Sequence, residues 1–218
     1  MADVPSQAQR SSPDGGRGQT VLGEAARLGL RPGLRVGLFG GSFNPAHSGH
    51  LAVSDTARRR ARLDRVVWLV SPQSPLKQAG DYLPLAERVA RARRLTAGRA
   101  WLTVTDIEAA LGTRYTADTL ARLESLSRAR LVWIMGADSL AGFHRWRDWR
   151  GLASRTPMLV VSRPGEAMGA LKGEAARTLA SRRLADPTAL PTAAPPAWCY
   201  LHTVHDPASA TAIRGRRD

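Results

Sequence analysis

Cysteine and lysine are almost absent from this sequence, and long apolar runs are missing altogether. The single cysteine, Cys199, excludes an intrachain disulfide and leaves no cysteine cluster for zinc, so we expect a small buried hydrophobic residue there. No run of about eighteen apolar residues occurs, which excludes a membrane-spanning helix, and the first residues lack the charged-then-apolar order of a signal peptide. We therefore expect a cytosolic protein without a membrane partner.

Acidic residues are scarce beside basic ones, since 18 Asp and Glu face 32 Lys and Arg and the formal net charge is +14 at pH 7. Such a charge attracts nucleic acids and small anionic substrates alike. Lys77 and Lys172 are the only lysines, and the arginines cluster at 58–60, 91–94 and 214–217, which is typical of solvated helix faces. We therefore favour a small anionic substrate over a nucleic acid.

Little apolar periodicity is present in residues 1–32, which are rich in Ser, Gly, Pro and Gln. Such a segment buries too little apolar surface to offset its ordering entropy, so we predict a flexible N-terminal tail with at most a short helix over 20–30. The remaining residues, 33–218, are enough for one globular domain, and a hydrophobic content of 43% in the whole chain supplies its core.

From residue 34 onward, apolar runs alternate with helical patterns. Continuous apolar runs such as 66–70 indicate strands that are buried on both faces. The predicted strands are 34–40, 66–70, 101–107, 131–135, 158–161 and 198–204, and the predicted helices are 50–62, 85–97, 117–126, 139–143, 146–155 and 171–184, with loops over 71–83 and 185–196. This alternation predicts an α/β fold, a doubly wound, Rossmann-like parallel sheet with helices on both faces.

A glycine turn and two histidines follow the first predicted strand. Gly40 and Gly41 let the backbone turn sharply and approach a ligand, because no Cβ is in the way. His47 and His50 lie three residues apart, so they share one face of a first helical turn if a helix begins near Ser48. Two imidazoles, exposed backbone N–H groups and a helix N-terminus together predict a phosphate site.

Further chemistry-bearing residues also follow predicted strands. Ligands of doubly wound sheets bind outside the carboxyl ends of the strands, where the strand order reverses. Lys77 follows the second strand, Gly136 and Asp138 follow the fourth, and Arg163 follows the fifth, so we expect them to gather near the glycine turn. Asp138 has a second interpretation as the N-cap of the next helix, and the two roles are compatible.

The segment from Gly41 to His50 resembles the motif G-x-F-x-P-x-H-x-G-H of the nucleotidyltransferases related to class I aminoacyl-tRNA synthetases. The fixed positions of the motif are filled by Gly41, Phe43, Pro45, His47, Gly49 and His50. Within that superfamily, residues 136–140, 162–165 and 209–214 resemble the bacterial nicotinate-nucleotide adenylyltransferases. The resemblance covers residues 34–214 of the chain.

The resemblance implies transfer of AMP from ATP to nicotinate mononucleotide, giving deamido-NAD (nicotinate adenine dinucleotide) and pyrophosphate in NAD biosynthesis. It implies that His47, His50 and Arg214 are catalytic, that Mg²⁺ is carried with ATP, and that Asp138 contacts the ribose hydroxyls of the adenosine half. The ATP-binding residues implied in this way are Gly40, Gly41, Ser42, Phe43, His47, His50, Gly136, Asp138, Ser209, Thr211 and Arg214. Such a transfer mainly requires positioning and charge neutralisation, without a covalent intermediate.

A pocket for the mononucleotide is also implied by the resemblance. Its residues are Ser42, Lys77, Thr116, Ala117, Trp146 and Arg163. Backbone amides near Thr116 would hold the pyridine carboxylate, and Trp146 would stack on the cationic pyridinium ring. The sequence departs from the family pattern at 74–76, where Ser-Pro-Leu replaces the usual Pro-Pro-His, and it ends four residues after Arg214.

Some residues have structural interpretations as well. Trp146 is a candidate core residue, and for Trp149 the core is the interpretation that we favour. Cys199, His202 and His205 have a spacing that suggests a metal, but the two histidines would face opposite sides of a strand, so we expect no metal site there.

Alternatives for the whole chain come from two classes. One is a transferase of the same superfamily that acts on nicotinamide mononucleotide or phosphopantetheine, or that transfers a cytidylyl group. The other is a basic nucleic-acid-binding module, which is disfavoured because no recognition motif and no aromatic-rich RNA-binding strand is present. A homo-oligomer is left open, because the sequence does not fix the oligomeric state.

Overall fold

The computed structural model describes residues 23, 26, 28–72, 83–162 and 167–202. Some of the predicted site residues lie outside the described residues: Lys77, Arg163, Ser209, Thr211 and Arg214. Within the described part of the chain, no helix combines the length and the apolar character that crossing a bilayer requires.

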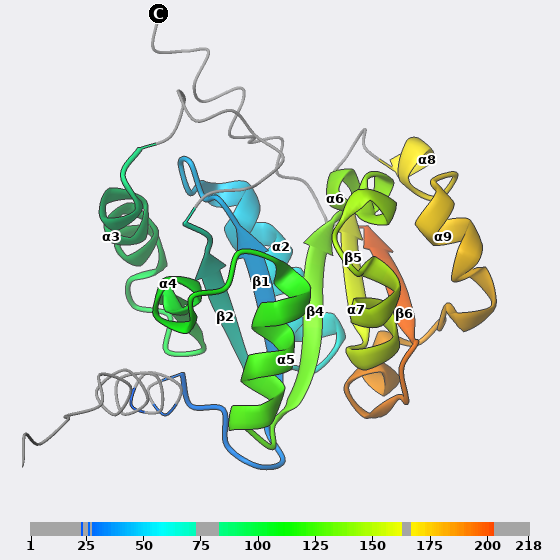
Figure 1. The fold of residues 1–218 in the computed structure, drawn as a ribbon, viewed down its shortest axis with the longest axis horizontal. Helices are drawn as coiled ribbons and strands as arrows, with labels where there is room; N and C mark the ends of the chain where they lie inside the picture. The colour runs from blue at the N-terminus through cyan, green and yellow to red at the C-terminus, as the bar shows by residue number, and fades with distance from the viewer. Residues whose placement is uncertain (1–22, 24–25, 27, 73–82, 163–166, 203–218) are drawn as a thin grey trace, which may run out of the picture.

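The centre of the molecule is a six-stranded sheet in the order β3-β2-β1-β4-β5-β6, and every neighbouring pair is parallel (Figure 1). The strands are β1 (Arg35–Gly41), β2 (Arg65–Val70), β3 (Leu102–Thr105), β4 (Arg130–Gly136), β5 (Met158–Ser162) and β6 (Trp198–His202). This is the Rossmann strand order, so the predicted doubly wound sheet is confirmed.

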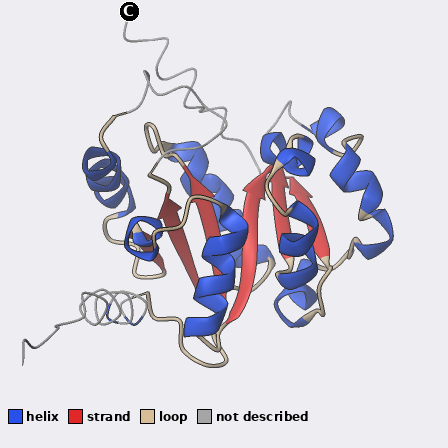
Figure 2. Ribbon diagram, viewed as in Figure 1, coloured by secondary structure: helices blue, strands red, loops and turns tan. Residues whose placement is uncertain are grey.

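Helices cover both faces of the sheet (Figure 2). They are α2 (Ser48–Arg60), α3 (Leu85–Thr96), α4 (Ile107–Leu111), α5 (Thr116–Leu126), α6 (Ala137–Ala141), α7 (Trp149–Arg155), α8 (Ala167–Ala170) and α9 (Glu174–Thr178), with 3₁₀ turns η2 (Phe143–Arg145), η3 (Ala180–Arg182) and η4 (Pro187–Thr192). In Figure 1, α5 and α7 cross the near face of the sheet and α2 lies behind it.

Two apolar clusters, one on each face of the sheet, form the core. Neighbouring residues of one strand divide between them: Val67 packs in the cluster that includes α5 and α7, whereas Trp68 packs in the cluster that includes α2 and α3. Both side chains are fully buried, as expected for a strand that is apolar throughout. The sheet therefore holds the loops at its carboxyl edge on a rigid base.

Two predicted helices differ most from the structure. The predicted helix 146–155 begins only at Trp149, because Asp148 adopts a left-handed conformation (φ 50°) and accepts a hydrogen bond from the Gly151 N–H at 3.2 Å as the N-cap. The single helix predicted over 171–184 is wrong, because extended Gly173 caps a new helix, α9, which ends at Thr178 and is followed by a 3₁₀ turn.

Two other segments contain short helices that we did not predict. The predicted strand 101–107 ends at Thr105, whose hydroxyl oxygen accepts from the Ile107 N–H at 3.1 Å and so helps to start α4. The predicted loop 185–196 contains η4, which Asp186 caps by accepting from the Thr188 N–H at 2.8 Å. Leu190 of this turn is fully buried, which explains why an otherwise proline-rich segment is ordered here.

The end of the predicted tail belongs to the core. Leu28 and Leu30 are only 2% and 8% exposed, and both pack in the cluster that includes α5 and α7. The expectation that residues 1–32 contribute nothing to the core is therefore wrong at these two positions. Two leucines are too few to produce an apolar periodicity in the sequence, and core elements are predicted from that periodicity.

Candidate active site

The carboxyl ends of β1 and β4 lie side by side at the centre of the sheet. β1 pairs with β2 on one side and with β4 on the other, so the strand order reverses between β1 and β4. This reversal is the position at which doubly wound sheets bind ligands. Gly40 and Gly41 are the last two residues of β1 and pair with Leu69 and Val70 of β2, so the predicted turn at these glycines is wrong and the chain turns only after Gly41. The end of β1 and the end of β4, where Gly136 and Asp138 lie, are brought together there, as the sequence predicts.

The two histidines meet at the first turn of α2. The helix predicted over 50–62 begins two residues earlier, at Ser48, so that His47 is its N-cap and His50 lies in its first turn. The His47 N–H donates to Nδ1 of His50 at 3.2 Å, and the two ring centroids are 3.9 Å apart. Because Nδ1 of His50 accepts this bond, a neutral His50 carries its proton on Nε2. The pair therefore sits at the positive end of a helix of 13 residues.

Aromatic packing fixes the His50 ring from below. Phe43 is 1% exposed, stacks on Trp68 with centroids 4.6 Å apart, and lies 4.8 Å from His50 between centroids. The Trp68 indole N–H donates to the Ser54 hydroxyl at 2.7 Å, and that hydroxyl donates to the His50 carbonyl oxygen at 2.8 Å. The side chain of Phe43, a predicted ATP-binding residue, is thus enclosed in protein and packs beneath the His50 ring.

Gly40 has a packing role that the sequence did not reveal. A Cβ built at Gly40 would lie 2.3 Å from Cη2 of Trp133, so no larger residue fits beside that ring. Trp133 also meets Trp146 edge to face, with centroids 6.3 Å apart. The buried indole of Trp133 therefore lies against both Gly40 and Trp146, the second of which is predicted to bind the mononucleotide.

At the end of β4, Asp138 is exposed in the first turn of α6. The N-cap of α6 is Gly136 and not Asp138, so the N-cap interpretation of Asp138 is wrong. A Cβ at Gly136 would lie 2.3 Å from Oδ1 of Asp138, which shows that the carboxylate folds back over the glycine. The carboxylate is thus held at the reversal point and faces solvent.

Three of the residues predicted to bind the mononucleotide, Thr116, Ala117 and Trp146, come from two segments that meet. Thr116 and Ala117 are the first two residues of α5, whose N-cap is Tyr115. The Arg147 guanidinium lies over the Tyr115 ring, 4.6 Å from its centroid, and so ties the start of α5 to the residue after Trp146. Trp146 itself is half-buried and meets Phe143 edge to face at 5.4 Å.

The neighbouring Trp149 is 6% exposed in the core, as favoured. Cys199 is 1% exposed, and burial raises the pKa of its thiol to about 11, so this residue is the small buried hydrophobic residue that the sequence predicts.

Glu108 is a buried carboxyl beneath this region that the sequence analysis did not identify. It is 8% exposed, and burial raises its pKa to about 7, although the Thr119 hydroxyl opposes this shift by donating to Oε1 at 3.2 Å. The same hydroxyl lies 2.8 Å from that of Thr113 and 3.2 Å from the Tyr115 carbonyl oxygen. The network therefore braces the turn that leads into α5.

Arg88 is a second residue that sequence reasoning missed. The sequence analysis did not single it out among the arginines, and it is 1% exposed. The signal was present, because Arg88 lies three residues after Leu85 and four before Ala92, on the buried stripe of α3. Its hydrogen bonds reach the loop that follows β1.

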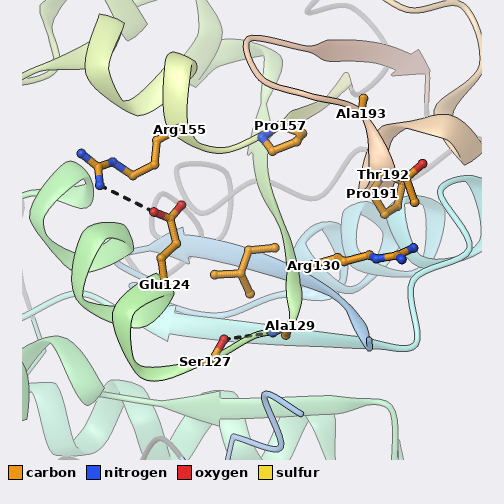
Figure 3. Close-up of a pocket in the computed structure, with 10 residues that line it drawn as sticks. Glu124, Ser127, Ala129, Arg130, Arg155, Pro157, Pro191, Thr192 and Ala193 are labelled. Carbon is orange, nitrogen blue, oxygen red and sulfur yellow. Dashed lines mark hydrogen bonds and ion pairs between the residues drawn. The ribbon is translucent and has the colours of Figure 1, made fainter. Parts of the chain in front are cut away.

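A cavity of about 460 Å³ lies at the opposite edge of the sheet, near the amino ends of β4 and β5 (Figure 3). Arg130 and Pro157, next to those ends, line it, and Arg155 reaches toward Glu124 with Nη1 and Oε2 3.7 Å apart. Its place in the fold separates it from the histidine pair. The described residues at the carboxyl edge form the candidate active site, and this cavity is not part of it.

Comparison with known proteins found a matching family profile and several similar sequences. The sequence profile of the cytidylyltransferase-like family matches residues 38–216. A probable nicotinate-nucleotide adenylyltransferase of Caulobacter sp. (strain K31) is 50% identical over 187 residues, which cover 84% of this chain and 98% of that protein. Another, of Methylorubrum extorquens, is 51% identical over 186 residues, which cover 84% of this chain and 100% of that protein.

The fold also resembles solved structures. Plasmodium falciparum nicotinic acid mononucleotide adenylyltransferase complexed with NaAD superposes with a TM-score of 0.63 over 84% of this chain and 83% of that chain. The sequences are only 12% identical, so this likeness concerns the fold alone.

Proposed function

This chain belongs to the cytidylyltransferase-like family and, within it, to the nicotinate-nucleotide adenylyltransferases, and from that membership we infer that it transfers AMP from ATP to nicotinate mononucleotide. The products are nicotinate adenine dinucleotide and pyrophosphate, and the reaction is a step of NAD biosynthesis. The observation that carries this function is the identity of 50% and 51% over 98% and 100% of the two relatives.

The ATP phosphates are proposed to lie over the N-terminus of α2. The helix dipole favours negative charge there, and the Nε2–H of His50 is a donor for a phosphate oxygen. His47, next to it, supplies the second imidazole. Because charge grows on the α-phosphate oxygens during transfer, donors that are already in place stabilise the transition state more than the ground state.

In the proposed reaction, a phosphate oxygen of the mononucleotide attacks the α-phosphorus of ATP, and the bond to the leaving pyrophosphate breaks in line. Mg²⁺ supplies charge neutralisation on the leaving pyrophosphate. It is proposed to arrive on the ATP phosphates, because Mg²⁺ keeps several of its waters and is usually held through substrate phosphates rather than by an all-protein cage. Asp138 is proposed to accept hydrogen bonds from the adenosine ribose hydroxyls.

The mononucleotide is proposed to bind between the start of α5 and Trp146. The first N–H groups of α5, at Thr116 and Ala117, suit a carboxylate because they are unpaired within the helix and lie at its positive end. The half-buried indole of Trp146 would stack on the pyridinium ring. Residues outside the described ranges complete the proposal through the family resemblance: Lys77 and Arg163 for the mononucleotide, and Ser209, Thr211 and Arg214 for ATP.

A pyrophosphate-release assay with ATP and Mg²⁺ tests the function. The acceptors are nicotinate mononucleotide, nicotinamide mononucleotide and phosphopantetheine, and CTP replaces ATP as a second donor. We expect ATP with nicotinate mononucleotide to give the highest kcat/KM, by about tenfold or more, and the dinucleotide product to be identified by its mass. A higher kcat/KM with any other pair would overturn the substrate assignment.

The cytosol is the proposed compartment for this reaction. A homo-oligomer is tested separately, by the mass of the purified chain in solution.

A further inference from the structure

We propose that Arg88 is a positioning residue for adenylyl transfer, which aims the backbone N–H groups of Ser42 and Phe43 toward the ATP phosphates by holding the loop after β1 against the carboxyl end of β2. The proposal rests on the proposed function. It deepens it by assigning a role to a residue of α3 that was not predicted to bind a substrate and that bonds to the backbone of Ser42, a residue predicted to bind both substrates.

The Arg88 guanidinium is bonded to carbonyl oxygens from three places. Nη1 donates to Ser42 at 2.7 Å and to Ser71 at 2.8 Å, Nη2 donates to Pro72 at 2.7 Å, and Nε donates to Leu83 at 2.9 Å. The side chain thus joins the turn after β1, the end of β2 and the start of α3. Arg88 is only 1% exposed, and removing its charge from water costs free energy, so the hydrogen bonds to all of these carbonyl groups are needed to offset that cost.

These bonds fix the orientation of two consecutive peptides. The Ser42 carbonyl points to Arg88, and the Gly41 carbonyl accepts from the Ser71 N–H at 2.9 Å and from its hydroxyl at 3.3 Å. In a planar trans peptide the N–H points opposite to the C=O. The N–H groups of Ser42 and Phe43 are therefore both directed away from Arg88 and β2, and successive N–H groups that share a direction form an anion-binding concavity.

Backbone strain at the next residue supports a functional reason for this geometry. Phe43 has φ 46°, a left-handed conformation that a bulky residue rarely adopts and that is strained. The loop keeps this conformation because two contacts oppose its relaxation, the stack of Phe43 on Trp68 and the Arg88 bond to Ser42. Asn44 adds a third, since its Oδ1 accepts from the Leu83 N–H at 3.2 Å.

Only arginine has the donors that this site uses. Its planar guanidinium carries five N–H groups in a fixed fork, whereas lysine offers three donors on one nitrogen and cannot span carbonyls that lie on different sides. Replacing Arg88 by lysine keeps the charge and removes the fork. A role that depended on positive charge alone would survive that change, and a positioning role would not.

The experiment compares Arg88→Lys, Arg88→Met and the matched control Arg91→Met. Arg91 lies on the same helix and pairs with Glu87, bonded through Nε to Oε1 at 3.0 Å on the more exposed side. Each protein is checked by circular dichroism and melting temperature, then assayed well below melting for kcat and for both KM values. Binding of a non-hydrolysable ATP analogue is measured by calorimetry.

We expect Arg88→Lys to lower kcat about thirtyfold or more while the KM for ATP and the Kd of the analogue change by less than about threefold. Arg91→Met should keep the wild-type kcat. A lower melting temperature with unchanged kcat in Arg88→Lys would show a purely structural role and overturn the proposal. If Arg88→Met does not fold, Arg88→Lys decides by the same criteria.

The activity of the wild-type protein distinguishes a failure of the proposed function from a failure of the role assigned to Arg88. If it releases no pyrophosphate from ATP and nicotinate mononucleotide, the proposed function fails whatever the variants do. If the wild type is active and Arg88→Lys equals it in kcat, the function stands and only the role of Arg88 falls.

Discussion

Glu108→Gln is expected to stabilise the protein at alkaline pH. The carboxyl is 8% exposed, and burial holds its pKa near 7, against about 4.5 for an exposed glutamate. Deprotonation is therefore harder in the folded protein than in the unfolded chain. It follows that the free energy of unfolding of the wild type falls as pH rises through this interval and levels off above about pH 7.

The magnitude follows from the interval between the two pKa values. An interval from about 4.5 to about 7 corresponds to about 3 kcal/mol, at about 1.4 kcal/mol for each pH unit. Glutamine resembles the neutral carboxyl in size and keeps an oxygen that accepts from the Thr119 hydroxyl. We therefore expect Glu108→Gln to exceed the wild type by about 3 kcal/mol near pH 8.5 and by less than about 1 kcal/mol near pH 5.

Urea unfolding followed by circular dichroism measures this difference at both pH values. Other titrating groups are the same in the wild type and in Glu108→Gln, so their contributions cancel in the difference between the two free energies of unfolding. Glu87→Gln, which removes a partly exposed carboxylate paired with Arg91, is the control and should change stability by less than about 0.5 kcal/mol. The reasoning would be refuted if the difference in free energy of unfolding between Glu108→Gln and the wild type were equal at the two pH values. It would also be refuted if Glu108→Gln were less stable than the wild type near pH 8.5.

Three further predictions concern the site and the core. His47→Ala and His50→Ala should each lower kcat by about a hundredfold or more with an unchanged circular dichroism spectrum, and a normal kcat would remove that histidine from the mechanism. Leu28→Ala should lower the free energy of unfolding by about 2–5 kcal/mol in urea titrations, and an unchanged midpoint would show that this leucine is dispensable. Trp146→Ala should raise the KM for the mononucleotide and leave that for ATP almost unchanged. If only the KM for ATP rises in Trp146→Ala, the acceptor pocket does not include Trp146.

The sheet was predictable because its signal is repeated along the chain. Each strand is an apolar run, and the alternation with helical patterns leaves few topologies for a parallel sheet. The position of the two histidines at the start of α2 was predictable for a different reason, since their spacing of three residues fixes the local geometry once a helix begins near Ser48.

What sequence reasoning missed depends on contacts between distant residues. The position of Arg88 on the apolar stripe of α3 indicates burial, but its acceptors are carbonyl groups, which every residue carries and no sequence pattern marks. Glu108 looked like a strand end, since the hydroxyl that bonds to it comes from Thr119 on the next helix. The helix predicted over 146–155 failed at a single residue, Asp148, whose left-handed conformation is rare outside glycine.

The contact between Gly40 and Trp133 links two positions in any redesign of this protein. A methyl group at Gly40 would overlap the Trp133 indole, so alanine at position 40 requires a smaller residue at position 133. A smaller residue at position 133 alone leaves a void beside Gly40. We expect each substitution alone to lower the free energy of unfolding, whereas the double change keeps the packed volume closer to that of the wild type. In a combinatorial library the two codons therefore have to be varied as one unit, and screening them independently would discard the compatible pair.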